Sequence, residues 1–167
     1  CRWDTEFNQS SDGVCHSFTG GTAMAFDSSL LYITDDSNNW LKAVSPYNNY
    51  NVEKAVTNGD AGGEGIAIIG NYLYIIDGTP DGGETMPWIS KWQKDTLTLV
   101  SKKYYLQGTG LSGGGSAITA NGDSLFVTDD NNNWLVRIDP DTLTVNSVKS
   151  DVYAGGNAIM YVGRGPF

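Results

Sequence analysis

The fold is decided by the stretch LYITDDSNNWL (residues 31–41), which recurs as LFVTDDNNNWL (residues 125–135) at an offset of 94 residues. A double glycine precedes each copy, in GGTAM (20–24) and in GGSAI (114–118). After each double glycine comes a small-apolar segment and then a Leu–aromatic–Ile/Val–Thr–Asp segment, and both are typical of short strands. Self-similarity at a long fixed period indicates a repeat architecture, so the repeat is interpreted before any single motif.

Two further copies complete the pattern. The second has GGEGI (62–66) and LYIID (73–77), and an insertion, Gly78–Pro87, separates it from its own tryptophan, Trp88. The fourth is divided between the ends of the chain: GGNAI (155–159) restarts the unit, and Trp3–Phe7 matches the segment that begins at Trp134. The chain therefore contains four units of about 42 residues.

Each unit predicts four short strands separated by turn signals, and no segment has sustained helical periodicity. Four-stranded units at this period are typical of propeller blades. We expect an all-β fold, a small β-propeller of about four four-stranded blades in one domain, 1–167. The expected blades are 20–61, 62–112, 113–154, and 155–167 together with 1–19. Residues 157–162 would be the innermost strand of the fourth blade, and 3–7 and 13–18 its outer strands. A fragment of a longer ring, or half of a dimeric ring, remains open.

The quoted strings resemble the blades of NHL- and YVTN-type β-propeller repeat proteins over nearly the whole chain. That resemblance implies a propeller but no single function, because the superfamily includes enzymes, binding scaffolds and interaction modules. The sequence departs from NHL blades in two ways. Trp40, Trp88 and Trp134 occupy positions that are often basic, and NHL rings usually have more blades.

Composition narrows the possible partners. The 167 residues carry a formal net charge of −9, and only 17% of them are charged, against about 25% in an average domain. An acidic surface repels phosphate backbones and anionic lipid headgroups, so we expect no nucleic-acid partner. We also expect no membrane insertion, because no apolar run approaches the roughly 18 residues that a membrane span needs.

The loops between the second and third strands should share one rim of the ring with the double glycines and the insertion. Function in rigid folds usually lies in such loops. Asp and Asn suit the hydroxyl edges of a sugar, and Trp suits its C–H face. The candidate ligand-binding residues are Asp35, Asp36, Asn38, Asn39, Trp40, Trp88, Asp129, Asp130, Asn132, Asn133 and Trp134. The structural alternative is that Asp caps the turn, Asn adopts positive φ, and Trp packs between blades.

Metal binding and catalysis have weaker support. The acidic loops offer oxygen ligands suited to calcium, but without the alternating spacing of a calcium loop. An axial ion held by Glu64 and Asp77 is a separate option. The single histidine, His16, adjoins Cys15 on an expected outer strand, which is a poor place for a catalytic pocket. We assign no catalytic residue.

Cys1 and Cys15 lie close together in the sequence, which predicts one disulfide and an oxidising, secreted environment. Two free thiols are the alternative.

The sequence thus favours an extracellular, non-enzymatic binding module. The most plausible form is a lectin-like, multivalent carbohydrate-binding propeller without a cofactor. Its partner would be a glycan or another small polar ligand, and a homo-oligomer is possible. The alternatives are a calcium-dependent lactonase- or strictosidine-synthase-like enzyme, and a structural or storage propeller with no small ligand.

Overall fold

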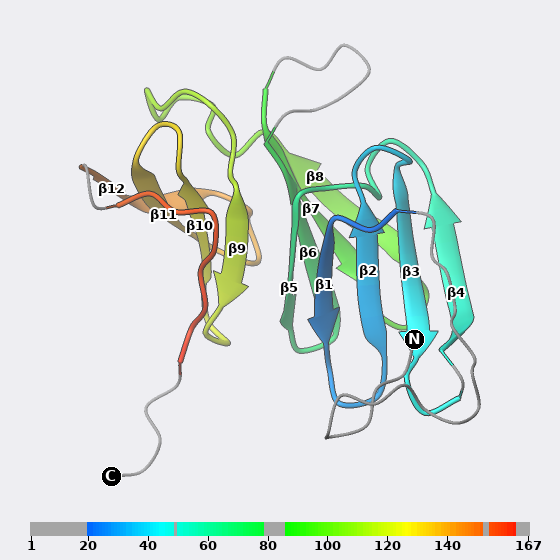
Figure 1. Ribbon diagram of the computed structural model, residues 1–167. Coiled ribbons are helices and arrows are strands. Elements are labelled where there is room, and N and C mark those ends of the chain that lie inside the picture. The colour runs from blue at the N-terminus through cyan, green and yellow to red at the C-terminus, as the bar shows by residue number, and fades with distance from the viewer. Residues whose placement is uncertain (1–19, 49, 79–85, 152–153, 163–167) are drawn as a thin grey trace, which may run out of the picture.

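A computed structural model of the chain describes residues 20–48, 50–78, 86–151 and 154–162. These residues form three antiparallel sheets of four strands each (Figure 1). Cys1, Cys15 and the expected outer strands 3–7 and 13–18 lie outside the described residues. Among the residues that are described, no helix is long and apolar enough to cross a membrane.

Each sheet is one repeat, and its strands follow one another in chain order. The first contains β1 (Ala23–Phe26), β2 (Leu31–Asp35), β3 (Trp40–Ser45) and β4 (Asn51–Thr57). The second contains β5 (Gly65–Ile69), β6 (Tyr72–Asp77), β7 (Trp88–Gln93) and β8 (Thr98–Lys103). The third contains β9 (Ala117–Ala120), β10 (Leu125–Asp129), β11 (Trp134–Ile138) and β12 (Val145–Ser150).

The register repeats from sheet to sheet. The last residue of the second strand pairs with the tryptophan that begins the third: Asp35 with Trp40, Asp77 with Trp88, and Asp129 with Trp134. The ladder between the third and fourth strands shifts register at one equivalent place in each sheet, after Ala43, Lys91 and Arg137. Such bulges bend and twist a strand locally. The three units are therefore geometrically equivalent blades.

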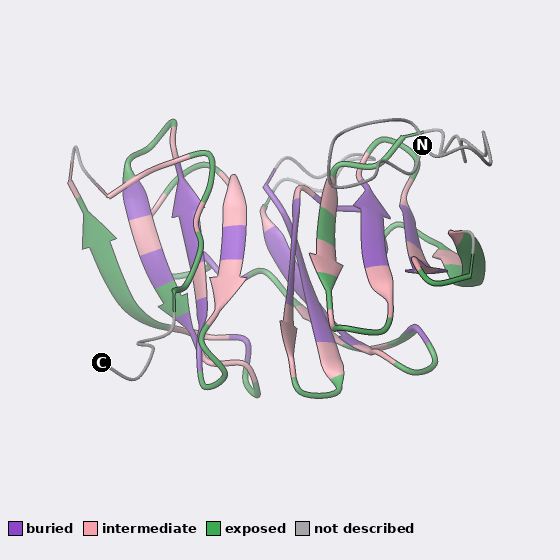
Figure 2. Ribbon diagram, turned by 60° about the horizontal axis from the view of Figure 1, so that its bottom comes forward, coloured by how far each residue is buried: buried purple, intermediate pink, exposed green. Residues whose placement is uncertain are grey.

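The core lies between blades. Apolar side chains of the first and second blades form one buried cluster, which includes Tyr32, Leu41 and Trp88. Tyr74, Ile89 and Trp134 belong to a second cluster, between the second and third blades. The middle strands of each blade are mostly buried, while the outermost strands β4 and β12 are exposed (Figure 2). Burial between blades is the main force that holds the sheets together.

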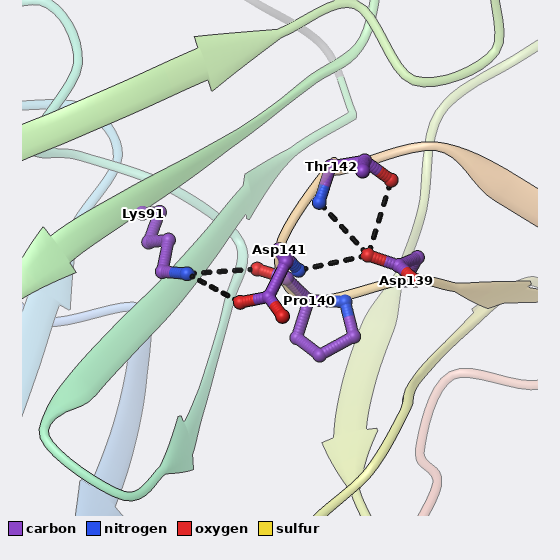
Figure 3. Close-up of polar contacts among 5 residues, drawn as sticks. All are labelled: Lys91, Asp139, Pro140, Asp141 and Thr142. Carbon is purple, nitrogen blue, oxygen red and sulfur yellow. Dashed lines mark hydrogen bonds and ion pairs between the residues drawn. The ribbon is translucent and has the colours of Figure 1, made fainter.

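A polar contact also joins the second and third blades (Figure 3). Lys91 Nζ donates to the carbonyl oxygen of Pro140 at 3.1 Å and forms an ion pair with Asp141 at 3.2 Å. Its ammonium group also lies 4.3 Å from the centroid of the Tyr72 ring. Asp139 accepts hydrogen bonds from the backbone amides of Asp141 and Thr142 and so fixes the turn that Lys91 reaches.

The fourth unit differs from the prediction. No strand is assigned over residues 157–162, which were expected to be an innermost strand. The segment runs beside β9 (Figure 1), and the Tyr161 amide donates to Thr119 Oγ1 at 3.1 Å. In the other three blades the inner strand is paired with the second strand of its own repeat. The residues that the repeat assigns to that neighbouring strand begin only at about 166, outside the described part of the chain.

Candidate functional site

A polar depression of about 510 Å³ opens on the rim that carries the double glycines. All four repeats line it with the same position, the residue directly after the double glycine: Thr22, Glu64, Ser116 and Asn157. We call this depression the axial cup. Its other lining residues are Gly78, Gly113, Gly114, Asp129, Asp130, Asn131 and Asn132.

Backbone hydrogen bonds hold three of these positions in the same way. The amide of Thr22 donates to the Thr34 carbonyl at 2.7 Å, and the amide of Ser116 donates to the Thr128 carbonyl at 2.7 Å. Glu64 makes the equivalent bond to Ile76 at 2.8 Å. Each inner strand therefore begins at the same height, and its first polar side chain reaches the rim.

The double glycines allow the blades to approach one another closely. A Cβ atom on Gly62 would lie 2.6 Å from the Asp35 carbonyl oxygen, and one on Gly155 would overlap the Asp129 carbonyl. Across the same two junctions, Thr34 Oγ1 donates to the Gly63 carbonyl at 3.0 Å and Thr128 Oγ1 donates to the Gly156 carbonyl at 2.7 Å. As predicted, the double glycines and the Asp/Asn loops share one rim.

The junction between the second and third blades is built differently. A Cβ atom on Gly114 would overlap the backbone of Gly78, the first residue of the insertion. A Cβ atom on Gly78 would lie 2.6 Å from Glu64 Oε2. Two backbones and one carboxylate therefore meet without side chains between them, and this contact forms one wall of the cup.

The loop 129–134 brings its polar residues to the cup through a compact set of hydrogen bonds. Asp129 Oδ1 accepts from the Asn132 amide at 2.6 Å and from Asn132 Nδ2 at 3.0 Å. Ser116 Oγ and Asp130 Oδ1 lie 2.7 Å apart, which ties the loop to the third blade's own inner strand. Asn133 has φ of 54°, the conformation that the structural alternative predicted.

The equivalent loop of the first blade has the same geometry but does not line the cup. Asp35 Oδ1 accepts from the Asn38 amide at 2.7 Å and from Asn38 Nδ2 at 2.9 Å, and Asn39 has φ of 51°. The other Asp35 oxygen accepts from the Gly21 amide at 2.5 Å. Four candidate residues, Asp35, Asp36, Asn38 and Asn39, therefore do not line the cup, while Asp129, Asp130 and Asn132 do. Asp36 adjoins it, because its amide donates to Thr22 Oγ1 at 3.0 Å.

The prediction that Trp40, Trp88 and Trp134 present indole faces to a ligand is wrong. Their exposed fractions are 6%, 1% and 1%. Each tryptophan begins the third strand of its blade. Trp88 and Trp134 belong to the buried clusters between blades, and Trp134 Nε1 donates to the Ser112 carbonyl at 3.0 Å. Trp40 belongs to a smaller buried cluster of the first blade, with Ile33 and Val44.

Tyr105 lies behind the cup and was not among the predicted site residues. Its exposed fraction is 3%, and its hydroxyl makes no hydrogen bond of good geometry with the described residues. A Cβ atom on Gly115, between two lining residues, would lie 2.8 Å from that hydroxyl. Burial raises the pKa of the Tyr105 hydroxyl above its usual range. The Gly115 backbone opposes this rise, and the carboxylates of Asp129, Glu64 and Asp77 add to it.

The cup is electronegative. Glu64, Asp129 and Asp130 contribute carboxylates, and no described residue that lines it is basic. Within the described ranges, no group of three or more His, Cys, Asp or Glu side chains is placed to hold a metal ion. Asp129 already uses its Oδ1 oxygen to order its loop. The carboxylates of the cup can accept hydrogen bonds from a ligand.

Some of the site residues that the sequence analysis missed could have been found by aligning the repeats, and one could not. Thr22, Ser116 and Asn157 occupy one column of the repeat alignment, so comparing the residues that follow each double glycine could have found them. Glu64 stands in that column too, and was considered only as a metal ligand. No sequence pattern indicates Tyr105, because its position depends on how two blades pack against each other.

No protein-family model and no curated protein matches the sequence. Solved structures do match. Hydrazine synthase from Kuenenia stuttgartiensis is 16% identical with a TM-score of 0.66, and the match covers 90% of this chain and 41% of that one. The WD40 repeats of RRP9 are 11% identical with a TM-score of 0.67, covering 87% of this chain and 43% of that one.

A third similar structure is the glutaminyl cyclase of Myxococcus xanthus, at 17% identity and a TM-score of 0.56, with 75% of this chain and 50% of that chain covered. The chain thus spans half or less of the length of these proteins. At such identities the likeness concerns the fold alone. With three equivalent antiparallel four-stranded sheets and these neighbours, the chain is an all-β protein with a β-propeller fold.

Proposed function

We propose that this chain is a non-enzymatic carbohydrate-binding module whose ligand enters the axial cup. One observation carries the proposal: the same position of all four repeats contributes a polar side chain to a single depression of about 510 Å³. That volume falls within the range of about 300–1,000 Å³ typical of small-ligand pockets. The proposed ligand class is the one expected from the sequence. The proposed site is the axial cup instead of all the Asp/Asn/Trp loops together.

The chemistry of the cup supports a polyhydroxylated ligand. Hydroxyl groups both donate and accept, so they can pair with carboxylates, with the Asn131 and Asn132 amides and with the Thr22 and Ser116 hydroxyls. Because the tryptophans are buried, recognition would use the polar edges of the sugar rather than stacking on its C–H face. Assignment to the NHL/YVTN type and an extracellular location, inferred from Cys1 and Cys15, are parts of the same proposal.

Ligand-observed saturation-transfer NMR with a panel of mono- and disaccharides tests this function. The chain provides a closely matched pair of variants, because Asn132→Ala and Asn38→Ala remove the equivalent Nδ2 hydrogen bond to an aspartate in two blades. Asn132→Ala also removes the oxygen that accepts from Ser112 Oγ at 3.3 Å. We expect Asn132→Ala to weaken sugar binding severalfold and Asn38→Ala to leave it unchanged. Thermal melts should show similar losses of stability for both variants.

Two results would contradict the proposal. If no sugar of the panel gives a signal with the full chain, the ligand class is wrong. If both variants weaken binding equally, the ligand is not held by the cup, and binding through several equivalent loops becomes the better account.

A further inference from the structure

Two apolar surfaces near the axis of the blades are exposed. The first-blade surface consists of Met24 and Phe26 on β1, and the C-terminal surface consists of Met160 and Val162 on the segment 157–162. None of these four side chains lines the axial cup. We infer that the two surfaces dock against each other between two copies of the chain, head to tail, so that two copies complete one propeller ring.

Positions along the inner strands alternate in the blade that they face. Ile66 on β5 is buried in the cluster shared with the first blade, and Ile118 on β9 is buried in the cluster shared with the second. Ala67, one residue after Ile66, is buried in the cluster shared with the third blade. Met24 stands in the repeat column of Ile66 and Ile118, and Met160 stands in that of Ala67. Met24 therefore faces the preceding blade of a ring, and Met160 faces the following one.

The exposure of both surfaces contrasts with the burial of their counterparts. The exposed fractions are 67% for Met24, 52% for Phe26, 78% for Met160 and 72% for Val162. At the junctions between the described blades, the residues in the same repeat columns are buried or half-buried. Large apolar side chains that gather on an exposed surface mark an interaction site. Each surface therefore has the character of one half of a blade junction.

The described residues of one chain do not bring the two surfaces together. A cavity of about 470 Å³ lies inside the arc of the inner strands, with Phe26 lining it from β1 and Met160 lining it from the segment 157–162. That segment runs beside β9, where the Tyr161 amide donates to Thr119 (Figure 1). By contrast, neighbouring inner strands at the other junctions share buried clusters. Covering both surfaces therefore takes a second molecule.

A second copy fits because it carries the missing half of each junction. Thr128 donates to the Gly156 carbonyl as Thr34 donates to the Gly63 carbonyl, so the segment 157–162 begins where the inner strand of a following blade begins. The next element of the ring must present a surface that faces a preceding blade, and the first-blade surface does so. Two different surfaces that pair head to tail generate a closed ring when the rotation between copies closes.

The curvature of the chain agrees with two copies in one ring. The match to the WD40 repeats of RRP9 covers 43% of that chain, and WD40 repeats form closed propellers. This chain follows the arc of less than half of such a propeller, which leaves room for a second arc of the same length. Two copies related by a two-fold rotation would make the same junction twice and leave neither apolar surface exposed.

Sedimentation equilibrium of the full chain, without added ligand, tests the inference. We expect a reversible dimer of the 18.0 kDa chain. Phe26→Asp and Met160→Asp should each raise the dimer Kd by about tenfold or more, because each places a charge in both junctions. The matched control is Val100→Asp, on β8, because Val100 has the same exposed fraction as Phe26 but lies on the outermost strand of its blade. It should leave the Kd unchanged.

A charge pair then identifies the contact. Phe26→Asp and Met160→Lys, combined in one chain, place opposite charges across the junction. The double variant should dimerise about tenfold more tightly than Phe26→Asp alone. A dimer in which two first-blade surfaces pair with each other would gain nothing from the lysine. Thermal melts followed by circular dichroism check that every variant keeps the fold.

Three results would overturn the inference. A chain that stays monomeric at every concentration would show that the two surfaces do not recruit a second copy, and closure within one molecule would be the better account. A dimer that persists in both Asp variants would place the association on another face. A double variant no more dimeric than Phe26→Asp would exclude the head-to-tail arrangement.

Discussion

The loops 35–40 and 129–134 differ at one residue in six, Ser37 against Asn131, and make the same internal hydrogen bonds, yet only the second lines the axial cup. In both, an aspartate accepts from the amide two residues before the tryptophan, and the intervening asparagine has positive φ. What differs is the neighbourhood. Beside the second loop lie the glycine run 113–115, Gly78 and Glu64. Local sequence determines the shape of a loop, and the adjoining blades determine whether it belongs to a site.

The largest expected effect is a loss of unfolding free energy when the tryptophan at the end of each loop is replaced, and it should differ between the two loops. Trp134→Ala should cost about 4–5 kcal/mol and Trp40→Ala about 3 kcal/mol of unfolding free energy. Trp134 packs between two blades and donates to Ser112, whereas Trp40 belongs to a smaller cluster. Chemical denaturation of both variants measures the difference. A larger loss for Trp40→Ala would contradict this ranking of the two junctions.

The next effect concerns the aspartates that order the loops. Asp35→Ala and Asp129→Ala should each destabilise the fold by about 2 kcal/mol, because each leaves the loop amides without their acceptor. Both carboxylates are buried, with exposed fractions of 2%. Only Asp129→Ala should also alter ligand binding. Paired thermal melts and titrations check this, and a binding defect in Asp35→Ala would mean that the first loop has a role the cup geometry does not assign to it.

The repeat predicted the strands, the turns and the equivalence of the three described blades, because the repeated strand and turn residues act locally. It also predicted the capping role of Asp129 and the positive φ of Asn133, as the structural alternative to ligand binding. It did not reveal which loop would border the cup or where Tyr105 would lie, because both depend on contacts between blades. The tryptophans were misassigned because a recurring aromatic residue is equally consistent with a sugar plate and with core packing.

The first and third blades also differ in the turn before the second strand, at the end of the strands opposite to the loops 35–40 and 129–134. Asp27 caps the turn before β2 with bonds to the amides of Ser29 and Leu30 and an ion pair to Lys94 at 2.8 Å, whereas Asn121 caps the equivalent turn of the third blade. Burial opposes ionisation of Asp27. The bonds from Leu30, Lys94 and Ser29 outweigh it and hold the pKa of Asp27 well below its usual range.

The contribution of Asp27 to stability is therefore present above the pKa of an unfolded aspartate, about 3.9, and is lost as the pH falls below it. Asp27→Asn should cost about 1–2 kcal/mol at pH 7 and should flatten the decline in stability between about pH 4 and pH 2. Denaturant midpoints measured across that range decide it. An unchanged acid limb in the variant would show that other carboxylates dominate acid unfolding.

The smallest expected effect tests the two threonines that bridge blades. Thr34→Val and Thr128→Val each remove one hydrogen bond to a glycine carbonyl of the following repeat and keep the side-chain shape. We expect losses of about 1 kcal/mol each. Thr34, with an exposed fraction of 0%, should lose slightly more than Thr128 at 5%. The second blade has Ile76 at this position, so Ile76→Thr should not stabilise the fold, because its junction already packs through Gly78 and Gly114.

The register shifts after Ala43, Lys91 and Arg137 also affect the outer circumference of the blades. Each shift twists an outermost strand at the edge of its sheet, where unpaired backbone groups could recruit a strand from another molecule. Charged residues reinforce this protection: Glu53 and Lys54 on β4, Lys102 and Lys103 on β8, and Lys149 on β12. A twisted, charged edge is a poor template for β-aggregation, so the perimeter should resist fibril formation even at high protein concentration.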